Sequence, residues 1–170
     1  MICPECKFDN IEGVDSCANC GQDLYSLDDP ASAQRRASGP AFINARLAEL
    51  PAQSPVRVQT TDPVGLAVRL MQNSDTECVL VMSGNSLAGI ITPWDVLHKV
   101  AGPTEDLNAV TCGQVMTADP VFLRDDDDIA VALNKMSVGG FRHIPLLQTG
   151  TPKAVVSIRE VFRHLAPHLV

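Results

Sequence analysis

The chain has 170 residues, of which 45% are hydrophobic and 19% are charged, and its formal net charge is −7. This composition excludes a disordered tail, which lacks apolar residues, and a surface that holds nucleic acid by bulk positive charge. No apolar run approaches the roughly 18 residues of a membrane span, and the first residues lack the basic and apolar regions of a secretory signal. We therefore expect a cytoplasmic protein without a membrane partner, made of one ordinary domain and a small appendage.

The first 24 residues contain two Cys-x-x-Cys pairs, Cys3 with Cys6 and Cys17 with Cys20, separated by ten residues. Two residues between the sulfurs let one tight turn direct both thiolates at a single ion. Four thiolates favour tetrahedral zinc, with iron as the competing metal. A segment this short and this poor in large apolar side chains requires a metal or a cross-link to fold, and the alternative is two disulfides or unligated thiols. The segment resembles a short zinc ribbon, so we predict a structural metal site within residues 1–24.

The charges of this segment oppose nucleic-acid binding, although zinc ribbons often bind nucleic acid. Five acidic residues stand against Lys7 alone, and four thiolates add further negative charge. Such a surface repels a phosphate backbone. We therefore predict that the ribbon contacts a protein partner, whose identity the sequence does not define, and that nucleic acid is disfavoured.

A linker and a short helix are predicted between the ribbon and the main apolar mass. Residues 25–40 are rich in Ser, Ala, Asp, Pro and Gln without an apolar period, which is typical of a linker. In residues 41–53 apolar side chains recur at helical spacing up to Pro51, which predicts a docking helix followed by a connection. These apolar residues are Phe42, Ile43, Leu47 and Leu50.

The rest of the chain is an internal repeat. Adding 65 to each position from 55 to 100 superposes this segment on residues 120–165 without a gap, and apolar positions repeat along with identical ones. The identical pairs are Pro55/Pro120, Val56/Val121, Asp62/Asp127, Ala67/Ala132, Met71/Met136 and Val96/Val161. We interpret residues 54–102 and 103–170 as two copies of one unit.

Each copy predicts the element order β-α-β-β-α. The first strand is short (VRV at 56–58 and VFL at 121–123), and an amphipathic helix follows it. Asp62 and Asp127 stand at the start of that helix and are expected to cap its free N–H groups. Two apolar strands and a final helix complete the copy, so the predicted fold class is α/β in the broad sense, an α+β tandem repeat.

Four motifs carry a resemblance to a known family. GIITPWD (89–95) ends the first copy and AVVSIRE (154–160) the second, VMTADPV (115–121) opens the second copy, and GFRHIPL (140–146) lies within it. In this order and spacing they resemble a pair of cystathionine-β-synthase (CBS) domains, the Bateman module, over about residues 54–168. The resemblance implies tandem CBS repeats that form a homodimer through their helical faces.

The strand-to-helix junctions in these motifs have a chemical logic of their own. A Thr or Ser at the end of a strand places a hydroxyl at a helix N-terminus, where free N–H groups favour a phosphate, and an acid three residues later can accept from ribose hydroxyls. The resemblance implies these roles and an adenosine nucleotide as ligand. The alternative is that both pairs only cap their helices. The nucleotide-binding residues so implied are Thr92, Asp95, Thr117, Arg142, His143, Ile144, Pro145, Ser157, Arg159 and Glu160.

The two implied sites differ in charge. Glu77 and Cys78 of the first copy stand where the second has Arg142 and His143, and Glu77 repels a phosphate. The second copy has Glu160 in place of the shorter Asp, which displaces the carboxylate by about 1.5 Å. We therefore predict one dominant site for AMP, ADP or ATP.

The sequence shows no combination of acid, base and nucleophile that could carry a reaction. We predict a non-catalytic regulatory or sensor protein rather than an enzyme. Two alternatives remain: a nucleic-acid-binding protein that uses the ribbon as reader and the CBS pair as a ligand switch, and a redox protein with iron at the four thiolates.

Overall fold

The computed structural model describes residues 2–3, 8–11, 14, 17–19, 45–100 and 106–168. By internal contacts the chain divides into two compact units. Unit 1 comprises Met1–Ala52, Leu123–Ile144 and Val156–Val170, and unit 2 comprises Gln53–Phe122 and Pro145–Val155. In the described ranges, no helix is long and apolar enough to cross a membrane.

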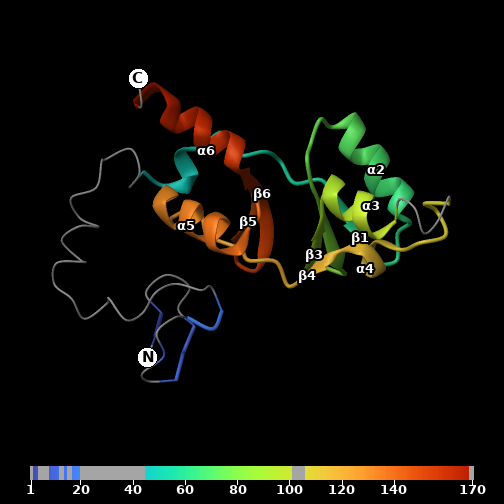
Figure 1. The fold of residues 1–170 in the computed structure, drawn as a ribbon, viewed down its shortest axis with the longest axis horizontal. Coiled ribbons are helices and arrows are strands. Elements are labelled where there is room, and N and C mark those ends of the chain that lie inside the picture. The colour runs from blue at the N-terminus through green and yellow to red at the C-terminus, as the bar shows by residue number, and fades with distance from the viewer. Residues whose placement is uncertain are drawn as a thin grey trace. The chain divides into compact units, whose positions relative to one another are not determined.

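Unit 2 contains a four-stranded sheet with strand order β1-β2-β3-β4, and helices α2 and α3 pack on β2 and β3 (Figure 1). Strands β1 and β2 are parallel, whereas the β2-β3 and β3-β4 pairs are antiparallel. The strands are β1 (Arg57–Gln59), β2 (Val79–Ser83), β3 (Ser86–Ile91) and β4 (Thr117–Ala118). The helices are α2 (Val64–Asn73), α3 (Pro93–Lys99) and α4 (Cys112–Val115).

Strand β2 forms the centre of the core because both of its faces are covered. Val79 and Val81 pack in one cluster with Ile91 and the buried face of α2. Leu80 and Met82 pack in a second cluster with Cys78, Ile90 and Val155. The apolar run at 79–82 therefore lacks the alternation of a half-exposed strand.

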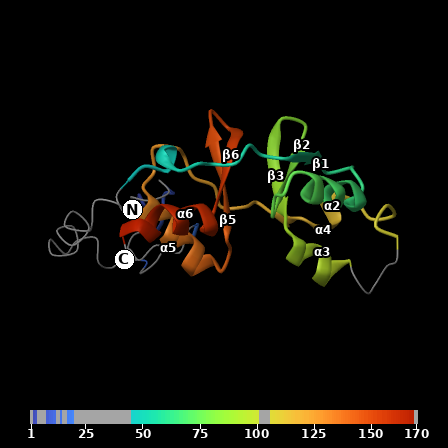
Figure 2. The ribbon, with the colours of Figure 1, turned by 90° about the horizontal axis from the view of Figure 1, so that it is seen from above.

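Unit 1 contains helices α5 and α6, which pack against each other (Figure 2). Helix α5 ends at Gly140, whose φ of +67° is a left-handed conformation that glycine adopts without steric cost. The antiparallel neighbours β5 and β6 form a two-stranded sheet, of which residues 145–155 belong to unit 2. The elements are η2 (Leu47–Glu49), α5 (Ile129–Gly139), β5 (His143–Gln148), β6 (Thr151–Ser157), α6 (Ile158–Leu165) and η3 (Ala166–His168).

The predicted tandem repeat and the mixed α+β class are confirmed, with one difference in the second copy. The first copy has the order β1-α2-β2-β3-α3, and the second has α5-β5-β6-α6. The strand predicted at 121–123 is reduced to a single bridging residue, Leu123. Leu123 is 3% exposed whereas Phe122 is 52% exposed, so the burial that would hold a strand is confined to one residue.

The repeat extends further upstream than the sequence comparison detects. In unit 1, Leu47 N–H donates to Asp127 C=O at 2.9 Å. In unit 2, Cys112 N–H donates to Asp62 C=O at 2.8 Å, at positions 65 residues later and earlier, respectively. The segment before each copy thus docks onto a helix start, and residues 112–118 belong to unit 2 with the first copy.

The segment predicted as a docking helix is, in its described part, a single 3-10 turn. Arg46 is extended and pairs with Asp128 in an isolated β-bridge, and the turn follows at Leu47–Glu49. Leu50 is extended again because it precedes Pro51, which disfavours the helical conformation of the residue before it. Residues 41–44 and the predicted linker at 25–40 lie outside the described residues.

Asp62 and Asp127 do not have the predicted capping role. Asp62 Oδ2 accepts from Gln59 N–H at 2.7 Å, and Asp127 Oδ2 accepts from Arg124 N–H at 2.7 Å. Each aspartate therefore closes the turn before its helix, and the helix N-caps are Pro63 and Asp128. The identity of these two residues in the repeat is explained by this turn.

Candidate functional site

The first strand-to-helix junction is a reciprocal capping box made by Thr92 and Asp95. Thr92 follows β3, and Pro93 occupies the first position of α3, where its missing N–H has no cost. Thr92 N–H and Thr92 Oγ1 donate to Asp95 Oδ2 at 2.9 and 2.7 Å, and Asp95 N–H donates back to Thr92 Oγ1 at 3.4 Å. The predicted pair is therefore held in a fixed geometry at the edge of the sheet.

The second oxygen of Asp95 is also fully engaged. Lys99 Nζ donates to Asp95 Oδ1 at 2.8 Å, and Thr117 Oγ1 donates to it at 3.0 Å. Lys99 Nζ reaches the carbonyl oxygen of Val115 as well, at 2.8 Å. The structure thus brings Thr92, Asp95 and Thr117 together as predicted residues and adds Lys99. The spacing of four residues from Asp95 along a helix is the signal that could have indicated Lys99.

This network favours the ionised form of Asp95. The carboxyl is only 7% exposed, and burial by itself disfavours the charge. Hydrogen bonds from Lys99, Thr92 and Thr117 outweigh burial and hold the pKa of Asp95 below its ordinary value. Asp95 is therefore an anion at neutral pH.

The second junction repeats this arrangement with Ser157 and Glu160. Ser157 N–H donates to Glu160 Oε2 at 2.8 Å, Ser157 Oγ donates to the same oxygen, and Glu160 N–H donates to Ser157 Oγ at 3.4 Å. Ser157 and Glu160 are 8% and 2% exposed. The extra methylene of Glu160 is accommodated within the same capping box.

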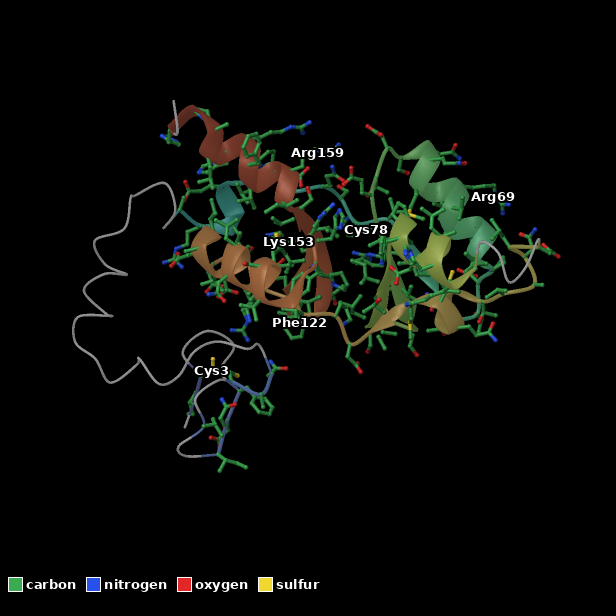
Figure 3. All side chains as sticks on the ribbon, in the orientation of Figure 1. Cys3, Arg69, Cys78, Phe122, Lys153 and Arg159 are labelled. Carbon is green, nitrogen blue, oxygen red and sulfur yellow. The ribbon has the colours of Figure 1, made fainter. Side chains whose placement is uncertain are left out.

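The remaining predicted residues lie at different depths. Arg142 is exposed, and its carbonyl accepts from Ile158 N–H at 2.9 Å, so the start of β5 adjoins the start of α6. Arg159 is exposed on the first turn of α6 (Figure 3). Ile144 is fully buried, and His143 is half-buried with a buried Nε2. Pro145 is buried and belongs to unit 2.

Both acids cap helices, which is the geometry of the alternative considered from the sequence. A ligand that uses either carboxylate must therefore exchange hydrogen bonds that the chain makes to itself. The geometry defines two equivalent anionic positions, one per copy, each next to a hydroxyl at a helix start.

The predicted metal ligands are described only in part, because Cys6 and Cys20 lie outside the described residues. Cys3 and Cys17 are buried thiols. Asn10, which the sequence reasoning missed, is 6% exposed and donates to Cys17 Sγ at 3.4 Å while accepting from Ala18 N–H at 2.9 Å. The described residues alone contain no group of three or more His, Cys, Asp or Glu that could hold a metal ion.

Two α+β copies with a hydroxyl and an acid at the same junction define a tandem-repeat module. The CBS domain model matches residues 47–102 and 112–167, two segments offset by the same 65 residues. The chain therefore belongs to the CBS domain family and carries two CBS domains.

Curated relatives share part of the chain. The CBS domain-containing protein CBSCBSPB5 of Arabidopsis thaliana is 34% identical over 93 residues, which cover 54% of this chain and 17% of that protein. An uncharacterized 17.7 kDa protein of Acidianus ambivalens is 33% identical over 88 residues, covering 51% of this chain and 52% of that protein. Homoserine O-acetyltransferase of Methanocorpusculum labreanum is 29% identical over 100 residues, covering 58% and 20%. The matched part of the chain thus spans less than a fifth of the Arabidopsis protein.

Solved structures share the fold. A putative signal-transduction protein with CBS domains from Burkholderia ambifaria has a TM-score of 0.66 at 24% identity and covers 71% of this chain and 90% of that one. A hexameric CBS-CP12 protein from bloom-forming cyanobacteria has a TM-score of 0.65 at 20% identity, covering 70% and 71%. The CBS domain pair of protein MJ0100, solved with 5′-methylthioadenosine and S-adenosyl-L-methionine, has a TM-score of 0.65 at 17% identity, covering 73% and 98%.

Proposed function

We propose that the chain is a non-catalytic, cytoplasmic regulatory protein that binds an adenosine nucleotide through its CBS pair. The observation that carries the proposal is the repeated junction, Thr92 with Asp95 and Ser157 with Glu160, where a hydroxyl and a buried carboxylate meet at a helix start. A ribose diol requires hydrogen-bond acceptors and a phosphate requires donors, and each junction supplies both. The adenosine ligands of the MJ0100 pair support this ligand class.

The second junction is the better place for the phosphates. Arg142 and Arg159 are exposed near the start of α6, and both guanidinium groups are available to pair with phosphate oxygens. The first copy has Glu77 and Cys78 at the positions equivalent to Arg142 and His143. We therefore place one dominant site for AMP, ADP or ATP at Ser157 and Glu160.

Exchange of Glu160 for glutamine is expected to weaken ATP binding by about tenfold to a hundredfold. The change keeps the size of the side chain and removes the charge that strengthens a hydrogen bond from ribose. Isothermal titration of the full chain with ATP measures the effect. Asp95→Asn is the matched control and is expected to leave the affinity of the dominant site within about twofold of the wild type. Equal losses in both variants would contradict the placement.

Ligand binding is expected to act by a shift of conformational populations. An adenosine nucleotide that interacts differently with two arrangements of the chain biases their equilibrium by that difference in affinity. The chain then requires a partner that distinguishes the two arrangements, and we assign that contact to the ribbon at residues 1–24.

We further propose that the ribbon holds a structural zinc ion through Cys3, Cys6, Cys17 and Cys20. Support comes from the burial of Cys3 and Cys17 and from the amide N–H that Asn10 directs at Cys17 Sγ. Such a donor stabilises a thiolate and fixes the orientation of a metal ligand. Metal analysis of protein purified without added zinc distinguishes zinc from iron.

A homodimer through the final helices of the two copies completes the proposal. Leu97 on α3 and Phe162 on α6 occupy equivalent positions and are 61% and 62% exposed, and Trp94 is 68% exposed. Exposed large apolar side chains at matching positions favour a protein contact.

Exchange of both Leu97 and Phe162 for glutamate is expected to convert the dimer to a monomer in light scattering at micromolar concentration. The introduced carboxylates would have to be desolvated in an apolar contact. Val138→Glu on α5, which replaces another exposed apolar residue, is the control and should remain dimeric. A wild-type chain that is monomeric would contradict the dimer.

A further inference from the structure

The carboxylate of Asp95 has no acceptor position left for a ligand. An ionised carboxylate offers about four lone-pair sites, two on each oxygen. Thr92 fills two sites on Oδ2 with its backbone N–H and its hydroxyl. Lys99 and Thr117 fill the two sites on Oδ1. A ribose diol can therefore bind Asp95 only if it displaces one of these donors.

Lys99 is the strongest donor in this set, because its ammonium is charged and is held at several points. Besides Asp95 Oδ1 it contacts the carbonyl oxygens of Val115 and Met116, at 2.8 and 3.5 Å. These residues directly precede Thr117, so one side chain ties α3 to the end of α4 and to β4. The Asp95 side chain is 9% exposed and that of Lys99 is 43% exposed, which places the ion pair at the edge of the buried region.

The second copy lacks this cation. The residue four positions after Glu160 on α6 is His164, where α3 has Lys99. His164 Nε2 is buried and has no hydrogen-bond partner among the described residues, so this ring nitrogen does not close the Glu160 carboxylate. The two copies therefore share the capping box and differ in the group that covers the acid.

We propose that Lys99 is a specificity-determining residue that closes the first nucleotide position, so that adenosine nucleotides occupy the second. The inference rests on the function proposed above. It explains why the copy with the shorter Asp is not the dominant site. It also predicts the opposite sign from a role of Lys99 as a phosphate ligand.

Exchange of Lys99 for methionine tests this inference, since it removes the charge and keeps most of the stem. The full chain is titrated calorimetrically with ATP and, separately, with adenosine, which has no phosphate. The wild type is expected to bind one ligand per chain. Lys99→Met is expected to bind a second one, with the first position strengthened at least about tenfold for both probes. Adding Asp95→Asn to Lys99→Met should remove that gain.

Arg69→Met controls for the loss of one positive charge, because Arg69 is exposed on α2 (Figure 3). Thermal unfolding verifies that each variant is folded. An unchanged stoichiometry in Lys99→Met, or weaker ATP binding with unchanged adenosine binding, overturns the closing role while the proposed function stands. If neither the wild type nor Lys99→Met binds either probe, the proposed function fails and the inference fails with it.

Discussion

Leu80→Ala is expected to destabilise unit 2 by about 2–5 kcal/mol. Leu80 is 0% exposed in the middle of β2, where it pairs with Arg57 of β1 and Ile90 of β3. Its side chain belongs to the cluster that includes Val155. Truncation therefore removes buried apolar contacts and leaves a cavity that the surrounding sheet cannot fill. Urea unfolding followed by circular dichroism measures the change in free energy of unfolding.

Leu87→Ala is the matched control for this effect. Leu87 lies half-buried on β3 and packs against the same cluster, so the substitution removes the same atoms from a wetter position. We expect a loss of about 1 kcal/mol there. Equal losses at the two positions would show that β2 is not the centre of the core.

Cys17→Ser is expected to lower zinc affinity by more than about a hundredfold. A hydroxyl is a poor zinc ligand, and three thiolates leave an open coordination position in a segment that depends on the metal for folding. Competition with a chromogenic chelator measures the affinity. Loss of metal is also expected to raise protease sensitivity within residues 1–24, because the segment has little apolar core of its own.

Cys112→Ser provides the control for the zinc experiment. Burial, together with the nearby negative charge of Asp62, raises the pKa of the Cys112 thiol to about 11. The thiol is therefore protonated at neutral pH and is no metal ligand there. Zinc content unaffected by Cys17→Ser, or lowered equally by Cys112→Ser, would contradict the four-cysteine site.

Much of the fold follows from the sequence because its local signals agree. The helical spacing around Ala67 and Ala132 and the apolar runs of the central strands predict elements whose existence the structure confirms. The 65-residue offset predicts the tandem repeat, and the CBS domain matches carry the same offset. These signals are local or self-similar, so one sequence suffices to read them.

The segments that dock before each copy could not be predicted in the same way. Leu47 and Cys112 are fixed by backbone hydrogen bonds to Asp127 and Asp62, and a backbone bond leaves no mark in side-chain chemistry. The helix predicted around Leu47 was wrong in its described part for this reason, since the bridge of Arg46 to Asp128 overrides local helical spacing.

The candidate site was predictable as a set of positions and not as a network. Thr117 reaches Asp95 because β4 pairs with β3, a contact between residues 22 apart that no local pattern indicates. Lys99 carried a usable signal in its helical spacing from Asp95. Asn10 lies between the cysteine pairs, and its role follows only from the turn that buries it.

Native mass spectrometry of the full chain with ATP tests the central claim most directly, because it reports the ligand, the metal and the oligomer together. We predict a dimer in which each chain carries one nucleotide and one zinc ion, with the nucleotide lost in Glu160→Gln and retained in Asp95→Asn. Two equally bound nucleotides per chain, or none at millimolar ATP, would contradict the account.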